Sequence, residues 1–566
     1  MFEKNLIVVK RSSRMFMARP TCTSQLFRCF GSTARMLLLV SGLIFCLLKI
    51  NNAILEASLS RKEVSVESFD ILILGGRVMD GTGNPWIRED IGIREGQIVA
   101  IGALEDASAE RVIEANNLYV VPGFIDSHSH AAEGLSRDGL QQGQPMLAQG
   151  VTTVMINPDG GGVVDLVSQR AELEKNGLGV NVVQLIGHGS VRREVLGMED
   201  RVPTPRELTR MSELVREGML SGAFGLSSGL FYAPGSYAET EELIVLAKVV
   251  SEFGGVHTSH IRDESNYSIG VVKAVQEIIE ISETAELPGI VTHMKALGPD
   301  SWGKSVASTI EIDEARARGV EIFTDQYPYE ASSTSVTGAL IPRWAQVGGD
   351  AEMKKRIENT VTRTRLLTDV RENIRRRGGP ASLQVSRFAP DQDLEGRNLE
   401  TIAQRWDLSP EEAALALAGR SRTSLVSFNM SEADVAHIMR RPYTMTSSDG
   451  GLVAIGEGKP HPRNYGAFAR KLSRYVFEKG IIEFEFAVRS MTSLPARVFR
   501  VPNRGVLREG AWADIAIFDP TLIKDTATYT EPHQLAKGMS YVLVNGVVVV
   551  DDGEFTSALP GKVLRR

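Results

Sequence analysis

Two histidines with a spacing typical of metal ligands, His128 and His130, end an apolar run that begins at Val121. If this run is a β-strand, its period of two places both imidazoles on one face, a few ångströms apart. Imidazole is the commonest protein ligand for transition metals, so the pair could form half of a zinc site. The same spacing also occurs in histidines that bind no metal, so the interpretation depends on further ligands elsewhere in the chain.

Three other apolar runs end in residues of the same chemistry. His257 and His260 follow one run, His293 follows a second, and Asp449 follows a third within Ser-Ser-Asp-Gly-Gly. His257 and His260 are three residues apart, so on a strand they face opposite sides, and His260, nearer the C-terminal end, is expected to point inward. These residues predict a metal site if the strands that carry them share one end of a sheet.

Eight strand-like apolar runs alternate with helix-like segments through the middle of the chain. The alternation predicts βα units and a parallel sheet, and apolar residues recur at helical spacing in 238–253. We therefore expect an α/β fold, a (β/α)8 TIM-like barrel whose site lies at the C-terminal ends of the strands. The eight runs are 120–130, 152–159, 181–190, 223–230, 255–263, 289–295, 320–329 and 443–450.

The two ends of the chain, excluding the N-terminal segment, share a different sequence pattern, in which short β-branched runs are broken by Gly and Asn. The Asn545-Gly546 pair is a strong signal for a two-residue hairpin. Residues 63–119 and 497–566 are therefore expected to form one small β-sandwich or β-barrel domain, with the (β/α)8 barrel at 120–496 between them. About 110 residues separate the seventh and eighth runs, which predicts a helical insertion after strand seven, at about 340–425.

The first 62 residues are expected to form a targeting or anchoring segment outside the fold. Residues 1–49 hold eight basic side chains and one acid, and the apolar run 36–48 is short for a membrane span but suits a signal peptide. A signal peptide, an uncleaved anchor and an Arg-rich organelle transit segment all fit this pattern. We favour export, to the periplasm or out of the cell, and expect membrane contact only through this segment.

Charge and cysteine usage exclude several classes of function. Beyond residue 49 the chain holds 55 basic and 69 acidic side chains, a net charge of −14, which argues against nucleic acid as a partner. All three cysteines, Cys22, Cys29 and Cys46, lie in the N-terminal segment. The body therefore has no cysteine nucleophile, thiolate metal ligand or disulfide scaffold. The sequence makes no prediction of the oligomeric state.

From about residue 69 to 566 the chain resembles the amidohydrolase superfamily, and within it the D-aminoacylases, which are N-acyl-D-amino-acid deacylases. The resemblance implies the same barrel, the β-domain built from both termini and the insertion after strand seven. It rests on Gly-Phe-Ile-Asp-Ser-His-Ser-His at 123–130, Gly-Ala-Phe-Gly-Leu-Ser-Ser-Gly-Leu at 222–230, Ser-His-Ile-Arg-Asp-Glu at 259–264, Tyr-Pro-Tyr at 327–329, Ser-Ser-Asp-Gly at 447–450 and His-Pro-Arg at 461–463.

The resemblance implies a metal set and a general base. His260 and His293 would hold one tightly bound Zn²⁺, and His128 and His130 would line a second, weaker metal position. Asp449 would be the general acid and base, taking a proton from the metal-activated water and delivering it to the leaving amine. Zinc lowers the pKa of a bound water toward about 7, so a carboxylate base suffices at neutral pH.

The resemblance also implies residues that bind the substrate. Tyr327 would stabilise the developing oxyanion, and Lys295, Ser333 and Arg463 would hold the α-carboxylate of the substrate. Arginine suits this task because its planar guanidinium pairs with a carboxylate through two hydrogen bonds.

The chain departs from the D-aminoacylase pattern at the end of the second strand. Where those enzymes supply a cysteine ligand, this chain has Pro158, which offers no donor atom. The fourth run also lacks the lysine with which related enzymes bridge two metals. The neighbouring Asp159 carries a carboxylate, an acceptable zinc ligand, so we expect His260, His293 and Asp159 to form the tight site. A harder oxygen ligand could also shift the preference toward another divalent metal, such as manganese or cobalt.

The expected activity is metal-dependent hydrolysis of the amide of small-molecule N-acyl-D-amino acids, which gives a carboxylate and a free D-amino acid. The D stereochemistry rests on the resemblance alone, and the side-chain and acyl preferences are not encoded in any motif. A cyclic amidase or dipeptidase is a second interpretation, against which the missing lysine counts. A non-catalytic barrel that has lost its metal is a third, and Pro158 is the residue that favours it.

Overall fold

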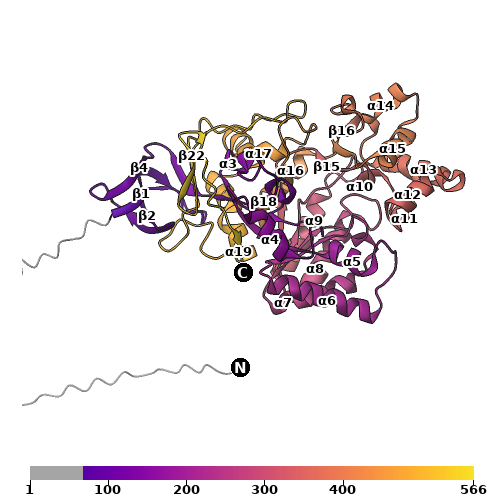
Figure 1. Ribbon diagram of the computed structural model, residues 1–566, viewed down its shortest axis with the longest axis horizontal. Coiled ribbons are helices and arrows are strands. Elements are labelled where there is room, and N and C mark those ends of the chain that lie inside the picture. The colour runs from indigo at the N-terminus through magenta and orange to yellow at the C-terminus, as the bar shows by residue number, and fades with distance from the viewer. Residues whose placement is uncertain (1–67) are drawn as a thin grey trace, which may run out of the picture. The chain divides into compact units, whose positions relative to one another are not determined.

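Parallel strands from the middle of the chain pair in sequence order within two sheets in the computed structural model, which describes residues 68–566 (Figure 1). β10 continues β9 after one residue, and the pairing of β19 (Gly450–Gly451) with β7 (Ser129–His130) joins the eighth strand to the first. This strand order is the one that the predicted (β/α)8 barrel, a closed ring of eight strands, requires. The strands of the ring are β6 (Phe124–Asp126), β8 (Val151–Ile156), β9 (Asn181–Gln184) with β10 (Ile186–Gly187), β11 (Gly225–Gly229), β12 (Val256–His260), β13 (Gly289–Val291), β14 (Ile322–Gln326) and β18 (Thr444–Thr446).

Amphipathic helices pack their apolar faces onto the outside of these strands. Helix α6 begins at Pro205, where Thr204 before it and Glu207 after it form a capping box, and it buries Leu214 and Val215 in the barrel core. The helices around the barrel are α4 (Leu166–Glu174), α5 (His188–Leu196), α6 (Pro205–Leu220), α7 (Thr240–Glu252), α8 (Val271–Ala285), α9 (Ser305–Ala317), α16 (Glu432–Met439), α18 (Phe484–Met491) and α19 (Ser493–Phe499). Of these, α6 and α7 lie side by side along the lower edge in Figure 1.

Strands from both chain ends form a single nine-stranded sheet, as predicted for the small β-domain. The central pairing is between β5 and β20, which brings the two ends of the body together, and a buried cluster that includes Ile73 and Ile515 packs against the sheet. The strands are β1 (Ser68–Val78), β2 (Ile87–Arg94), β3 (Gln97–Gly102), β4 (Ser108–Glu114), β5 (Tyr119–Pro122), β20 (Ile515–Phe518), β21 (Met539–Val544), β22 (Val547–Asp551) and β23 (Glu554–Phe555).

The chain crosses from this sheet to the barrel at Gly123. A Cβ atom there would collide with the side chain of Thr152, so the close approach of the two strands requires glycine. The first barrel strand therefore starts at Phe124, later than the predicted start at residue 120, because β5 (Tyr119–Pro122) belongs to the β-domain.

The insertion between β14 and β18 contains a small sheet as well as the predicted helices. Three antiparallel strands, in the order β15–β17–β16, lie beside six helices, seen at the upper right of Figure 1. The strands are β15 (Ser332–Ser335), β16 (Leu383–Arg387) and β17 (Ser424–Ser427), and the helices are α10 (Val336–Leu340), α11 (Arg343–Gln346), α12 (Asp350–Glu358), α13 (Thr360–Arg376), α14 (Leu399–Trp406) and α15 (Pro410–Arg420).

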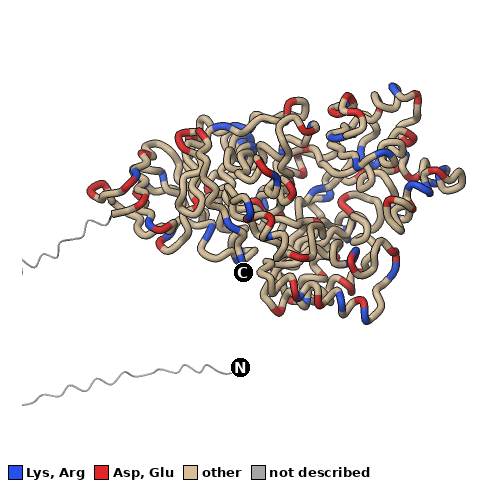
Figure 2. Tube along the Cα trace, in the orientation of Figure 1, with Lys and Arg blue, Asp and Glu red and all other residues tan. Residues whose placement is uncertain are grey.

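The predicted targeting segment, residues 1–62, lies outside the described residues. Within 68–566, no helix combines the length and apolarity needed to cross a bilayer. Acidic and basic positions are intermixed along this part of the chain in Figure 2.

Lys471 is a buried cation with no carboxylate within ion-pair distance among residues 68–566. Its Nζ donates to Thr446 Oγ1 at 2.7 Å and to Ser490 Oγ at 2.8 Å. Burial lowers the pKa of Lys471 to about 7, far below that of an exposed lysine. Between pH 7 and 10 the unfolded chain therefore binds a proton that the folded protein does not, and this difference destabilises the fold most at the lower pH.

We predict that Lys471→Met raises the melting temperature at pH 7. The gain should shrink as the pH rises, because the penalty for neutralising the lysine falls by about 1.4 kcal/mol per pH unit. Thr446 Oγ1 and Ser490 Oγ lie 3.2 Å apart and can bond each other in the variant. Differential scanning calorimetry of both proteins at pH 7, 8 and 9 measures the effect, and a pH-independent difference would contradict it.

Candidate metal centre

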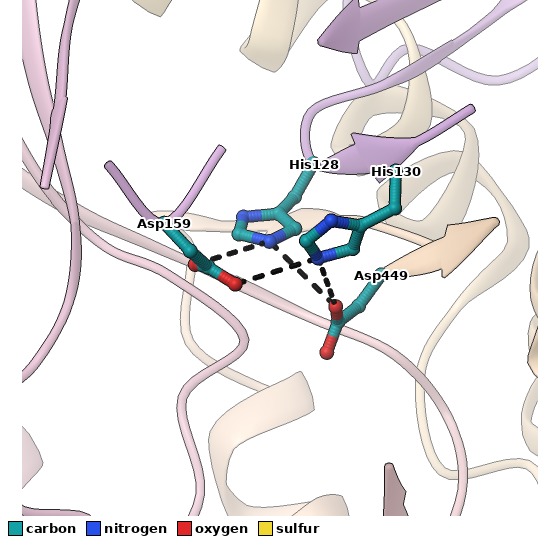
Figure 3. A group of neighbouring side chains, drawn as sticks. All are labelled: His128, His130, Asp159 and Asp449. Atoms are coloured by element: carbon teal, nitrogen blue, oxygen red, sulfur yellow. Dashed lines mark ion pairs between the residues drawn. The ribbon is translucent and has the colours of Figure 1, made fainter. Parts of the chain in front are cut away.

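Two histidines from the first strand face two aspartates across the barrel mouth (Figure 3). His128 Nε2 lies 3.4 Å from Asp159 Oδ1 and 3.6 Å from Asp449 Oδ1. His130 Nε2 lies 3.4 Å from Asp159 Oδ2 and 3.2 Å from Asp449 Oδ1. One donor atom from each of the four residues lies within 4.8 Å of all the others, a spacing suited to one metal ion. The prediction that both imidazoles point to the same side is confirmed.

A second group of donors lies directly beside the first and shares Asp159 with it. His293 Nε2 is 3.3 Å from Asp159 Oδ1, and His260 Nδ1 is 3.8 Å from the same oxygen. The two imidazole nitrogens are 3.0 Å apart. Asp159, His260 and His293, which the sequence predicts as the tight site, lie together, and Asp159 belongs to both donor groups. Pro158, which precedes it, lines the same cavity.

Three of these residues have left-handed backbone conformations, which side chains other than glycine adopt only at some cost. The φ angles are +55° at Asp159, +35° at His293 and +48° at Asp449. Asp and His are among the residues that tolerate this region best, and such strain concentrates at functional sites. Asp325 helps to hold the backbone of His293 in this conformation. Its Oδ1 accepts from the backbone N–H of His293 at 2.8 Å and from Ser447 Oγ at 2.6 Å.

A buried carboxylate, Glu264, contacts the outward side of both histidines in the second group. Its Oε1 lies 3.1 Å from His293 Nδ1 and its Oε2 lies 3.6 Å from His260 Nε2. Lys295 Nζ donates to Glu264 Oε1 at 2.6 Å and lies 2.6 Å from His293 Nδ1. Carboxylates in this position orient imidazole ligands and raise their basicity.

The electrostatics of the site suit a cation. Burial alone would raise the pKa of Asp159, but the charges of His128 and His293 hold it well below its usual range, so the carboxylate stays ionised. Burial lowers the pKa of His260 to about 3, which keeps this imidazole neutral, as a metal ligand must be. Against the effect of burial, Asp449 and Asp159 raise the pKa of His293 to about 10, a sign of concentrated negative charge.

The donor set itself fits a transition metal. The buried Nε2 atom of His128 has no hydrogen-bond partner among residues 68–566, although it points at two carboxylates. Buried polar atoms in native proteins are rarely left without a partner, and a metal bound to this nitrogen would supply one. Imidazole nitrogens with carboxylate oxygens are ligands that Zn²⁺ accepts at both positions.

The predicted substrate-binding residues line the same cavity of about 700 Å³. Arg463 Nη1 lies 2.7 Å from Asp449 Oδ2, and its guanidinium carbon is 4.6 Å from the ring centre of Tyr327. The Tyr327 hydroxyl donates to Met430 Sδ at 3.5 Å, and Ser333 lies on β15 of the insertion. Of the ten residues expected in the site, only His128 does not line the cavity, although its Nε2 lies 3.4 Å from Asp159 Oδ1.

Two other buried histidines lie outside the centre. His257 Nε2 lies 2.8 Å from Ser228 Oγ, so this ring faces away from His260 as the strand period predicts. His188 Nε2 lies 2.8 Å from Glu242 Oε1. Both are fully buried and serve the packing between strands and helices.

Several residues of the site were not identified from the sequence. Glu264 lies in the Ser-His-Ile-Arg-Asp-Glu motif at 259–264, and its position four residues after His260 is the one sequence feature that marks it as a neighbour of the metal ligands. Tyr232 packs its ring 4.6 Å from that of His260 and bonds Thr334 Oγ1 at 3.0 Å. Asp325 lies on β14 (Ile322–Gln326), a strand to which the sequence assigned no metal ligand.

A (β/α)8 barrel with imidazole and carboxylate ligands converging at its strand ends defines a metal-dependent hydrolase class. The chain belongs to the amidohydrolase family, whose sequence model matches residues 111–550. It is 34% identical over 523 residues to the N-acyl-D-glutamate deacylase of Alcaligenes xylosoxydans xylosoxydans, covering 88% of this chain and 97% of that protein. The D-aminoacylase of the same organism is 32% identical over 535 residues, covering 88% and 98%.

The chain is also similar to solved structures of an N-acyl-D-glutamate deacylase and a D-aminoacylase. The N-acyl-D-glutamate deacylase of Bordetella bronchiseptica, complexed with zinc and a phosphonate inhibitor that mimics the tetrahedral intermediate, matches with a TM-score of 0.75 and 33% identity. A D-aminoacylase structure described as having a binuclear metal centre matches with a TM-score of 0.75 and 30% identity. Each comparison covers 88% of this chain and 100% of the other.

Proposed function

We propose that this protein is a zinc-dependent hydrolase that cleaves the amide bond of N-acyl-D-amino acids. The observation that carries this proposal is the convergence of four histidines and two aspartates at one cavity, with Asp159 shared by two donor groups. The likeness to N-acyl-D-amino-acid deacylases over 88% of the chain supports the same reaction. The presence of both donor groups counts against the alternative of a non-catalytic barrel that has lost its metal.

His260, His293 and Asp159 would hold the tight metal, and His128 and His130, with Asp159 again, would hold the second. A bound divalent metal supplies Lewis acidity, which polarises the scissile carbonyl and makes water a stronger nucleophile at neutral pH. Metal ligands bind in their deprotonated forms, a condition that the lowered pKa values of Asp159 and His260 meet, whereas His293 would lose its proton when a metal binds.

Asp449 is placed to move protons during the reaction. Its Oδ1 faces the first-strand histidines, and its Oδ2 is held by Arg463. Burial alone would raise the pKa of Asp449, but the charge of Arg463 and then that of His293 lower it, so the group starts the reaction as a carboxylate. It can therefore take the proton of the attacking water and return it to the leaving amine.

The substrate's α-carboxylate would lie against Lys295, Ser333 and Arg463, which line the cavity from three different segments. Burial raises the pKa of Tyr327 well above its usual value, so its hydroxyl stays a hydrogen-bond donor throughout the working pH range. A donor of this kind can stabilise negative charge on the carbonyl oxygen once it turns from Met430 toward the substrate.

We propose export for the mature protein. The basic side chains of residues 1–49 and the apolar run 36–48 support it. N-terminal sequencing of protein recovered from the periplasm or medium tests this, and full-length protein in the cytosolic fraction would contradict it.

A substrate screen tests the proposed reaction. N-acetyl-D-amino acids should be hydrolysed at least about 100-fold faster than their L isomers, because a site that pairs the α-carboxylate rejects the mirror arrangement. Hydantoins and dipeptides serve as controls for the other amidohydrolase activities. Dialysis against a chelator should abolish turnover, and added Zn²⁺ should restore it. Faster hydrolysis of a hydantoin or dipeptide, or full activity in chelator, would contradict the proposal.

A further inference from the structure

The cavity contains one buried arginine that has no carboxylate partner. Arg377, just after α13 of the insertion, lines the cavity and is 2% exposed. Its Nε donates to Tyr267 Oη at 2.8 Å and its Nη1 to Ser427 Oγ at 3.2 Å. No carboxylate among residues 68–566 lies within ion-pair distance of it, and the same part of the chain offers no hydrogen-bond acceptor to its Nη2.

The other cations that line the cavity are either neutralised or exposed. Arg193 is exposed to solvent at the rim. A buried guanidinium without a counter-charge pays a desolvation cost that two neutral hydroxyl acceptors only partly offset. Arg377 is therefore the buried cation of this cavity whose counter-charge a ligand would have to supply. The neutralised cations are Lys295 with Glu264 at 2.6 Å, Arg387 with Glu457 at 2.6 Å and Arg463 with Asp449 at 2.7 Å.

The surroundings of Arg377 place it beside the predicted substrate, away from the metal ligands. Its partner Ser427 pairs with Ser332 across the β15–β17 ladder, and Ser332 is next to Ser333. On the other side, the ring of Phe231 lies between His260, at 5.5 Å, and Tyr267, at 5.3 Å. Arg377 thus contacts the strand that pairs with the one carrying Ser333, lines the same cavity as Ser333, and has the rings of Tyr267 and Phe231 on the side of His260.

We propose that Arg377 binds a carboxylate at the end of the substrate's side chain, so that the preferred substrates are N-acyl derivatives of acidic D-amino acids. This inference rests on the proposed deacylase function. The α-carboxylate occupies Lys295, Ser333 and Arg463, and the second carboxylate pairs with the free face of Arg377. The Tyr267 and Ser427 contacts fix the guanidinium so that little side-chain entropy is lost on binding.

The test compares N-acetyl-D-glutamate with N-acetyl-D-glutamine, which has the same shape but no side-chain charge. The wild-type protein should prefer the glutamate derivative in kcat/KM. Arg377→Met should lower the ratio of the two kcat/KM values by about 10- to 100-fold, the range for losing a hydrogen-bonded charged partner. Arg377→Lys should keep part of the preference, because the charge remains and the planar fork is lost.

Arg375→Met is the matched control. Arg375 lies two residues earlier in α13, is exposed, pairs with Asp300 at 2.9 Å and does not line the cavity. Its substitution should leave the ratio unchanged. An equal loss of both activities in Arg377→Met would mean that the residue only supports the fold, and a wild-type preference for the glutamine derivative would overturn the proposal.

Failure of the proposed function gives a different result. If the wild-type protein hydrolyses neither compound, the deacylase assignment fails, and calorimetric binding of the same two compounds to the metal-loaded protein then decides the role of Arg377. Tighter binding of N-acetyl-D-glutamate, lost in Arg377→Met, would support the carboxylate subsite, and equal binding of both compounds would overturn it.

Discussion

Replacing Asp159 by alanine is expected to remove metal from both positions at once. Its two oxygens lie 3.4 Å from His128 Nε2, 3.4 Å from His130 Nε2 and 3.3 Å from His293 Nε2, so neither donor group is complete without it. Loss of a residue that only orients a ligand weakens metal binding by about 10- to 100-fold, and loss of a shared ligand should exceed this. Elemental analysis of the purified variant measures the effect, and turnover should fall with the metal content.

Two further variants make this experiment specific. Asp159→Cys restores a ligand of the kind that the D-aminoacylase pattern has at the end of the second strand, so it should recover tight metal where alanine does not. Asp138→Ala removes an exposed carboxylate from the loop that precedes the second barrel strand and should leave the metal content unchanged. Full occupancy in Asp159→Ala would show that the histidines suffice and that Asp159 is not a ligand.

The fold was predictable because its signals are local and repeat along the chain. Each barrel strand is a short apolar run that ends in polar or glycine residues, and alternation with amphipathic helices leaves few arrangements other than a parallel barrel. That architecture then converts distant residues into neighbours, since strand ends meet at one mouth. His128 and His260 could therefore be placed at one site although 132 residues separate them in the sequence.

The finer arrangement of the site depends on backbone turns that have no periodic signal. A spacing of two would place His293 and Lys295 on one face of a regular strand, but β13 ends at Val291, and the φ of +35° at His293 breaks the alternation. Their contact instead comes from the Lys295 side chain folding back onto His293 Nδ1 at 2.6 Å. The sharing of Asp159 between two donor groups also depends on such a turn, in which its φ is +55°.

Contacts between segments that are distant in the sequence could not be predicted from the sequence either. The sheet of the insertion pairs β15 with β17, about 90 residues later, and its strands are only four or five residues long, too short to show a pattern. Arg377 lies in a run of arginines that suggests a solvated surface. Only tertiary packing distinguishes it from the exposed Arg375, two residues earlier.

Asp449→Asn is expected to keep the metal and lose most of the turnover. The amide keeps one oxygen facing His130, where Asp449 Oδ1 lies at 3.2 Å, but it cannot take a proton from water. General acid–base catalysis contributes about 10²- to 10⁴-fold, so kcat should fall by that factor with the metal content nearly unchanged. Steady-state kinetics on an N-acetyl-D-amino acid and elemental analysis of the same preparation separate the two effects.

Loss of the Arg463 contact must be distinguished from loss of the base, because Asp449→Asn weakens an ion pair whose atoms lie 2.7 Å apart. If Arg463 were released and the substrate merely bound less well, KM would rise while kcat held, since uniform binding does not affect the chemical step. Loss of the proton acceptor lowers kcat itself. Glu133→Gln, which neutralises another carboxylate that lines the cavity but touches no ligand, should change neither constant by more than about twofold. A near-normal kcat in Asp449→Asn would therefore exclude Asp449 as the general base and leave it the role of a metal ligand beside His130.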